Sequence, residues 1–115
     1  MNKDIEHIDV CVLTYKRPVL LEKLLLHLMK QLTLDLFSYS IIVVDNDANQ
    51  TASALTKRLS KQSPVNISYW CEPNQNIALA RNAAVLRSTG DYIAFIDDDE
   101  IPAKDWLLIL HKSIQ

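Results

Sequence analysis

The sequence predicts an α/β protein with an open, mostly parallel sheet of about four strands and helices on both faces. Four short apolar runs alternate with four helix-like segments along 115 residues, and such alternation is typical of parallel sheets joined by crossover helices. The runs are apolar at successive positions rather than at every second one, as expected of strands that are covered on both faces. The length indicates a single domain, residues 1–115.

The first half of the chain predicts strand, helix, strand and helix in that order. Residues 9–14 form an apolar run, and Pro18 suits the first turn of a helix. Leucines at helical spacing predict that this helix continues to about Leu32. Residues 40–44 predict the second strand, and residues 51–61 predict a helix whose first residue, a threonine, serves as its N-cap.

The second half repeats the alternation. Residues 66–71 predict a third strand, residues 77–87 a helix, and residues 92–96 a fourth strand. Gly90, the only glycine of the chain, suits the turn before that strand. Residues 105–114 predict a last helix. Because ligands of open α/β sheets bind outside the carboxyl ends of the strands, the residues that follow each strand are the candidates for function.

The charge balance argues against nucleic acid as a partner. With 12 basic and 14 acidic residues the formal net charge is −2, and no long basic stretch offers the phosphate contacts on which such binding depends. Residues 1–9 lack the apolar core of a signal peptide. The most apolar segment, residues 19–36, contains too many polar side chains to span a bilayer. We therefore predict a cytoplasmic protein, with peripheral association at the inner face of the membrane kept open.

Four acidic residues, Asp97 to Glu100, directly follow the fourth apolar run. Neighbouring carboxylates repel one another by about 1 kcal/mol per close pair even in water, and by more where water is excluded. A cation that offsets this repulsion is therefore expected. Mg²⁺ or Mn²⁺ suits the site best, because hard divalent cations prefer oxygen ligands.

Polar side chains also follow the other three predicted strands. They are Thr14-Tyr15-Lys16-Arg17 after the first, Asp45-Asn46-Asp47 after the second and Glu72 to Asn76 after the third, with Arg81 one turn into the next helix. Some have an ordinary structural alternative, since an aspartate after a strand is often a turn residue. A single glycine excludes the glycine-rich phosphate loops. A diphosphate would instead be neutralised by the metal together with Arg17 or Arg81.

These residues occur in an order that resembles the N-terminal, nucleotide-binding half of the family 2 glycosyltransferases, which have the GT-A fold. Any one of the matching segments is weak evidence alone, and the four in sequence are specific. They cover residues 12–18, 42–47, 76–82 and 90–102. The resemblance implies a metal-dependent, inverting, hexosyltransferase-like enzyme that transfers sugar from a nucleotide-diphosphate sugar, with a UDP-sugar favoured.

The resemblance also implies roles for single residues. Thr14 and Asp45 would contact the nucleotide base, and Arg81 would lie near the ribose or diphosphate. Asp97 and Asp99 would form the outer pair of the family's DxD motif and hold Mn²⁺ or Mg²⁺. The predicted nucleotide-sugar-binding residues are Thr14, Arg17, Asp45, Asn76, Arg81, Asp97 and Asp98. The predicted metal ligands are Asp97 and Asp99.

No catalytic base is assigned within the chain. In the family that the chain resembles, the base and the acceptor-binding part follow the acidic strand, so we expect both beyond Gln115. Glu100 is disfavoured as the base, because we expect it to turn away beside Pro102. A base must come within hydrogen-bond reach of the acceptor hydroxyl.

Two other functions stay open. One is a non-catalytic nucleotide-sugar-binding or oligomerisation module, which would associate through apolar residues of the last helix: Leu107, Leu108, Ile109, Leu110 and Ile114. The other is a Toprim-like Mg²⁺ domain for phosphoryl transfer. That fold would want an acidic residue in a glycine-bearing loop after its first strand, where this chain has Thr14 to Arg17.

Overall fold

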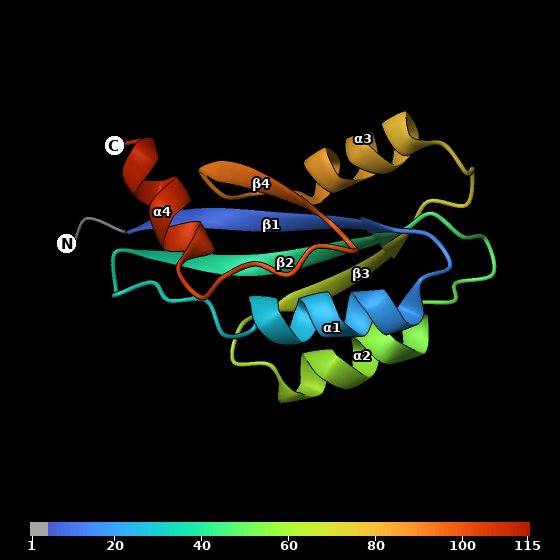
Figure 1. Ribbon diagram of the computed structural model, residues 1–115. Coiled ribbons are helices and arrows are strands. Elements are labelled where there is room, and N and C mark those ends of the chain that lie inside the picture. Colours follow the sequence, from blue (N-terminus) through green and yellow to red (C-terminus); the bar gives the residue numbers. More distant parts are fainter. Residues whose placement is uncertain (1–4) are drawn as a thin grey trace.

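The computed structural model describes residues 5–115 and contains one sheet of four parallel strands in the order β3-β2-β1-β4 (Figure 1). The strands are β1 (Glu6–Thr14), β2 (Phe37–Asp45), β3 (Ile67–Cys71) and β4 (Tyr92–Asp97). Their carboxyl ends are level, because Thr14 pairs with Asp45 and Leu13 pairs with Asp97. The predicted parallel α/β sheet is confirmed. Residues 1–4, on which part of the signal-peptide argument rests, lie outside the described residues.

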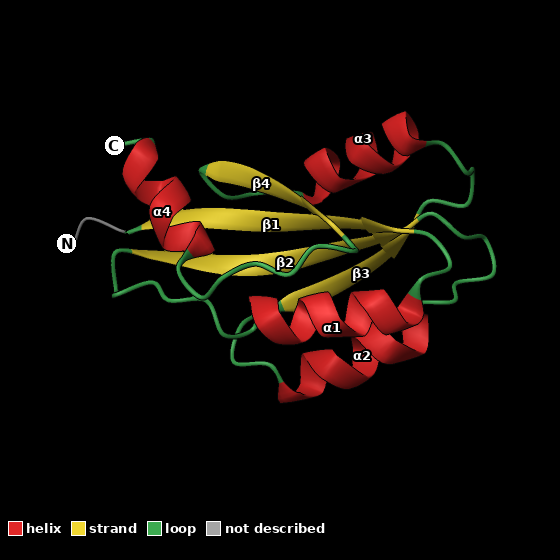
Figure 2. Ribbon diagram, in the orientation of Figure 1, coloured by secondary structure: helices red, strands yellow, loops and turns green. Residues whose placement is uncertain are grey.

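Helices cover both faces of the sheet, as predicted (Figure 2). They are α1 (Pro18–Leu28), α2 (Ser53–Gln62), α3 (Ile77–Arg87) and α4 (Trp106–Ser113). Buried residues of α1, α2 and α4 share one apolar cluster with the sheet, whereas α3 packs against a second cluster on the other face. Of the helices in residues 5–115, none combines the length and the apolar character that crossing a bilayer requires.

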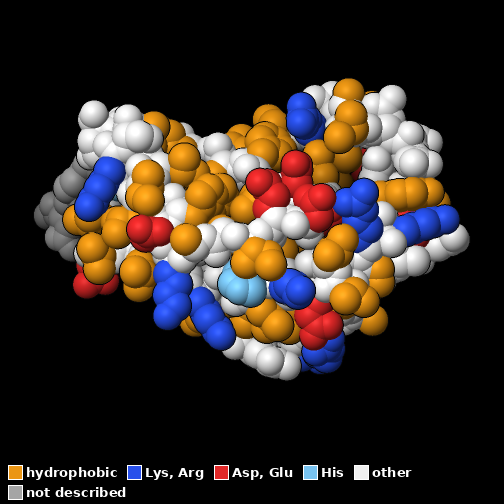
Figure 3. All heavy atoms as spheres, viewed as in Figure 1, with side chains coloured by type: hydrophobic (Ala, Val, Ile, Leu, Met, Phe, Trp, Pro, Cys, Tyr) orange, Lys and Arg blue, Asp and Glu red, His pale blue; other side chains and the backbone are white. Residues whose placement is uncertain are grey.

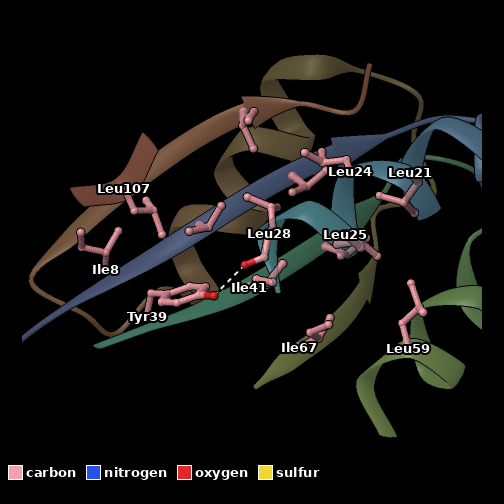
Figure 4. Packing of buried hydrophobic residues seen from close by; sticks show 14 of the residues in the cluster. Ile8, Leu21, Leu24, Leu25, Leu28, Tyr39, Ile41, Leu59, Ile67 and Leu107 are labelled. Atoms are coloured by element: carbon pink, nitrogen blue, oxygen red, sulfur yellow. Dashed lines mark hydrogen bonds between the residues drawn. The ribbon is translucent and has the colours of Figure 1, made fainter. Parts of the chain in front are cut away.

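The larger apolar cluster lies between the sheet and α1 (Figure 4). Leu21, Leu24, Leu25 and Leu28 form one stripe of α1 and are fully buried. The burial of each such side chain contributes about 1.5–3 kcal/mol relative to its exposure. Tyr39 joins strand to helix, since its hydroxyl donates a hydrogen bond of 2.7 Å to the Leu28 carbonyl. This packing fixes β1 and β2, which carry two of the predicted strand ends.

The smaller cluster holds α3 close to the sheet. Ala80 and Ala84 of α3 are buried against Cys11, Ile42 and Val44. Small side chains on this face allow the helix backbone to approach the strands. The N-terminus of α3 thereby comes to the carboxyl ends of the strands.

Two predicted helix boundaries are wrong. The first helix ends at Leu28 rather than near Leu32, because the residues that follow hold a distant segment. The side-chain nitrogen Nε2 of Gln31 donates a hydrogen bond of 2.7 Å to the Ala103 carbonyl. Its side-chain oxygen Oε1 accepts one of 2.9 Å from the backbone amide of Leu107. The second helix begins at Ser53, and Thr51 does not cap it. The Thr51 hydroxyl donates to Asp47 Oδ2 at 2.9 Å instead.

The apolar residues of α4 do not all reach the surface. Leu107 and Leu108 are buried in the main cluster, which corrects the prediction that they belong to an exposed patch. Ile109, Leu110 and Ile114 are exposed. The surface available for association is therefore smaller than the sequence indicates.

Candidate functional site

The candidate site lies where the strand order reverses. The chain builds β1, β2 and β3 outward in one direction, and α3 then carries it back across the sheet so that β4 pairs with β1 on the other side. Such switch points at the carboxyl ends of parallel strands are where open α/β sheets bind ligands. A cleft of about 400 Å³ opens there, bounded by the ends of β1 and β4 and the first turns of α3.

The cleft joins apolar walls with a polar rim. Its apolar residues are Leu13, Ile77, Ala80, Phe95 and Ile96. Its polar residues are Thr14, Tyr15, Arg17, Asn46, Gln75, Asn76, Arg81, Asp97, Asp98 and Asp99. Both the size and the mixture are typical of small-molecule sites. Six of the seven predicted nucleotide-sugar-binding residues therefore meet in one cleft, and Asp45 does not.

Asp98 holds two strand ends together. Only 6% of the residue is exposed. Its Oδ2 accepts a hydrogen bond of 3.0 Å from the Thr14 hydroxyl, and its Oδ1 accepts one of 3.2 Å from Arg17 Nη1. The end of β4 is thus tied to the turn between β1 and α1. Thr14 and Asp98 both line the cleft and are bonded to each other, and their contacts with a ligand stay a prediction.

Asp97 and Asp99 are exposed on either side of that anchor, and more than half of the Asp99 side chain reaches solvent. Figure 3 shows acidic side chains gathered near the end of β4, with a basic side chain beside them. Glu100 closes the turn, because its carboxylate accepts from the Asp97 amide at 3.0 Å. That bond holds the Glu100 carboxylate within the turn.

The donor set of Asp97 and Asp99 fits a hard divalent cation. Both offer carboxylate oxygens at the rim of the cleft, and Mg²⁺ is commonly held by one or two carboxylates together with phosphate and water oxygens. No cluster of three or more His, Cys, Asp or Glu side chains suited to a metal occurs within residues 5–115. Asp97 and Asp99 would thus be the carboxylate ligands that these residues offer to such a cation.

Arg17 and Arg81 bring positive charge to the two sides of the cleft. Arg17 Nη1 lies 3.8 Å from Asp99 Oδ2, in addition to its bond with Asp98. It therefore supplies part of the neutralisation that the sequence argument assigned to a metal alone. The Arg81 guanidinium lies 5.9 Å from the centre of the Phe95 ring, within cation–π range. Phe95 is a cleft residue that sequence reasoning missed.

Asn46, which sequence reasoning placed at a strand end without assigning it a role, organises the loop after β3. Its Nδ2 donates to the carbonyls of Glu72 and Asn74 at 2.8 Å each, and its Oδ1 accepts from the Asn76 amide at 3.0 Å. Asn76 in turn caps α3, with Oδ1 accepting from the amides of Ala78 and Leu79. The sequence signal that could have assigned a role to Asn46 is its place between two aspartates at the end of a strand.

Asp45 is not among the residues that line the cleft. The residue is fully buried, and its carboxylate accepts from the Tyr69 hydroxyl at 2.7 Å, the Ala52 amide at 3.0 Å and the Asp47 amide at 3.2 Å. Burial, and then the hydrogen bond to this carboxylate, raises the pKa of Tyr69 well above its usual value. The hydroxyl therefore remains a donor to Asp45, whose carboxylate accepts three hydrogen bonds from within the protein. The contact of Asp45 with a nucleotide base stays a prediction.

Comparison with known proteins decides the family. Residues 9–115 match the sequence profile of the family described as Glycosyl transferase family 2. The chain belongs to glycosyltransferase family 2. The resemblance carried by the four ordered segments is thus confirmed, and the cleft can be compared with those of other family 2 proteins.

Curated relatives support the assignment. The chain is 42% identical over 113 residues to the succinoglycan biosynthesis protein ExoM of Rhizobium meliloti, which covers 98% of this chain and 36% of ExoM. It is 31% identical over 78 residues to an uncharacterized glycosyltransferase of Rickettsia felis, which covers 68% of this chain and 13% of that protein. The chain therefore spans about a third or less of the length of these relatives.

Solved structures agree on the GT-A fold. TarS of S. aureus, residues 1–349, superposes with a TM-score of 0.78 at 22% identity over 93% of this family 2 chain and 32% of TarS. The mannosyltransferase PcManGT of Pyrobaculum calidifontis, in complex with GDP-Man and Mn²⁺, superposes with a TM-score of 0.78 at 25% identity, over 90% of this chain and 30% of that one. The same TarS fragment in complex with UDP gives a TM-score of 0.71 at 25% identity, covering 93% of this chain and 31% of that chain.

Proposed function

We propose that this chain binds the nucleotide-diphosphate-sugar donor of a metal-dependent, inverting glycosyltransferase. The observation that carries the proposal is the cleft at the switch point, where exposed Asp97 and Asp99 face the same space as Arg17 and Arg81. PcManGT, with GDP-Man and Mn²⁺, and TarS, with UDP, supply the analogy for the ligand class. A UDP-sugar is the favoured donor.

Within this proposal each charged group has a task. Asp97 and Asp99 hold Mn²⁺ or Mg²⁺, which would act as a Lewis acid on the diphosphate leaving group. Arg17 and Arg81 neutralise the phosphate oxygens from the two sides of the cleft, since charge-assisted bonds to phosphate are the stronger ones. Asn46 and Asn76 keep the loop after β3 at the end of the cleft where the base of the nucleotide would lie.

The base that takes the proton of the acceptor hydroxyl belongs, in this proposal, to a part of the enzyme outside these 115 residues. Glu100 is engaged in the turn, and Asp97 and Asp99 are committed to the metal.

A donor-binding module without transfer activity is the second candidate. In that case the apolar groove between β4 and α4, lined by Ile93, Phe95, Leu110 and Ile114, would be the surface on which another chain packs.

Calorimetric titration tests the donor site. The protein is titrated with UDP and with GDP, in excess Mn²⁺ and in excess chelator. We expect binding in Mn²⁺ and a loss of about tenfold or more in chelator, and Asp99→Asn should remove this metal dependence. Asp105→Asn, an exposed carboxylate outside the cleft, is the matched control and should bind like the wild type. Equal affinity with and without metal would refute the metal site.

A further inference from the structure

Arg17 stands between two carboxylates that the proposed site uses for different purposes. Its Nη1 lies 3.2 Å from Oδ1 of the buried Asp98 and 3.8 Å from Oδ2 of the exposed Asp99. Asp98 is the anchor that also binds Thr14. Asp99 is a proposed metal ligand. One guanidinium therefore offsets the charge of the anchor and of the ligand at once.

We infer that Arg17 is a positioning residue that occupies Asp99 while the cleft is empty and turns to the diphosphate when metal and nucleotide bind together. The inference rests on the proposed function. A divalent cation that approaches Asp99 is repelled by the neighbouring guanidinium, as like charges at a few ångströms are. The metal alone should therefore bind weakly. A diphosphate brings anionic oxygens that can accept the guanidinium donors, so Arg17 can leave Asp99 to the metal.

The surroundings of Arg17 permit this exchange. About half of its side chain is exposed. Arg17 is the N-cap residue of α1 but makes no side-chain capping bond, so the helix backbone does not hold the guanidinium. Lys16, directly before it, has a left-handed backbone with φ 54°, a conformation that surrounding structure must maintain in a non-glycine residue. The backbone of Arg17 is thus held in position, while its half-exposed guanidinium can exchange one acceptor for another.

The consequence is a coupling between the two ligands. Metal favours nucleotide and nucleotide favours metal by the same factor, because binding linkage is reciprocal. Arg17 carries part of that factor, since its charge opposes the metal alone and supports the metal with diphosphate. A residue that only fixed Asp98 would affect both ligands in the same direction.

The test measures Mn²⁺ binding without nucleotide, by paramagnetic resonance of the free ion, and UDP binding at saturating Mn²⁺, by calorimetry. Arg17→Gln keeps a donor for Asp98 and removes the charge, and Arg17→Ala removes both. We expect Mn²⁺ alone to bind about two- to fivefold tighter to both variants, the size of an exposed ion pair. UDP should bind about fivefold or more weakly.

Two control variants separate charge from geometry. Lys16→Ala removes the same charge one residue earlier, outside the cleft lining, and should change neither affinity by more than about twofold. Arg17→Lys retains the charge without the planar fork, so its Mn²⁺ affinity should match the wild type while its UDP affinity falls part of the way. Thermal melts verify that each variant is folded. If Arg17→Ala is not folded, the affinities of Arg17→Gln decide the test.

The outcomes are distinguishable. Weaker Mn²⁺ binding by Arg17→Gln, or unchanged Mn²⁺ and UDP affinities, overturns the role of Arg17 and leaves the proposed donor site standing. A wild-type protein that binds UDP equally well in chelator overturns the metal site and the inference with it. Opposite shifts for the two ligands support the inference.

Discussion

Asp45-Asn46-Asp47 and Asp97-Asp98-Asp99 end the two strands that flank β1, and they differ in what surrounds them. After β2, the two aspartates are almost completely buried and accept hydrogen bonds from within the protein. After β4, only the middle aspartate is buried, and its two neighbours are exposed at the cleft. β2 is a central strand with partners on both sides, whereas β4 is an edge strand of the described sheet. The carboxylates after β2 are covered by Tyr69 of β3 and by the turn before α2, whereas the outer pair after β4 remains exposed.

The largest effect that this comparison predicts is at Asp45. Asp45→Ala leaves three donors without their acceptor: the part-buried Tyr69 hydroxyl and the buried amides of Ala52 and Asp47. Each unsatisfied buried group costs about 1–3 kcal/mol, so we expect the free energy of unfolding to fall by about 3 kcal/mol or more. Urea denaturation measures it.

Asp97→Ala is the counterpart at the β4 end. The Asp97 side chain is exposed, and exposed substitutions usually change stability by about 0.5 kcal/mol or less. Relief of repulsion from Asp98 and Asp99 acts in the stabilising direction. Equal losses for Asp45→Ala and Asp97→Ala would contradict the contrast between the two strand ends.

A smaller loss is predicted at Asp98. Asp98→Ala removes the bonds to Thr14 and Arg17. Thr14 is left with an unpaired buried hydroxyl, whereas Arg17 can turn to solvent, so we expect a loss of about 1–2 kcal/mol. Thr14→Val, which removes the donor and keeps the shape, should cost less. A melting temperature of Asp98→Ala equal to that of Asp99→Ala would show that the middle aspartate is no anchor.

The sequence could predict the helices and strands and the gathering of polar residues at the strand ends. It could not predict which of these residues are buried and which line the cleft. Leucine spacing predicts the buried stripe of α1, because helical periodicity is local. The end of that helix depends on Ala103 and Leu107, more than 70 positions after Gln31. The burial of Asp45 depends on Tyr69, which reaches it only because β3 pairs with β2. No local pattern contains either contact.

Asn46 shows the same limit from the other side. The two acidic strand ends look alike in sequence, so reasoning from motifs assigned a ligand contact to Asp45 and named Asn46 only as part of the strand end. In the structure Asn46 reaches the cleft and binds the loop after β3, and Asp45 turns inward. Alternation of side chains along an extended backbone places neighbours on opposite sides. Knowing which side faces the cleft requires the strand order.

The last prediction concerns pH and the β2 end. The Asn49 amide first, and then the Thr51 hydroxyl and the charge of Lys16, hold the pKa of Asp47 below its usual value, against the opposing effect of desolvation. A carboxyl whose pKa is lower in the folded state stabilises the protein above the unfolded value, 3.8, and this stabilisation is lost as the pH falls through the folded value. Urea unfolding of the wild type and Asp47→Asn should therefore show a stability difference at neutral pH that closes in acid. Thr51→Val, which removes one of the donors, should narrow the difference at neutral pH. A wild-type advantage that persisted unchanged to about pH 2, below the usual range of aspartate pKa values, would mean that the hydrogen bonds around Asp47 do not depend on its charge.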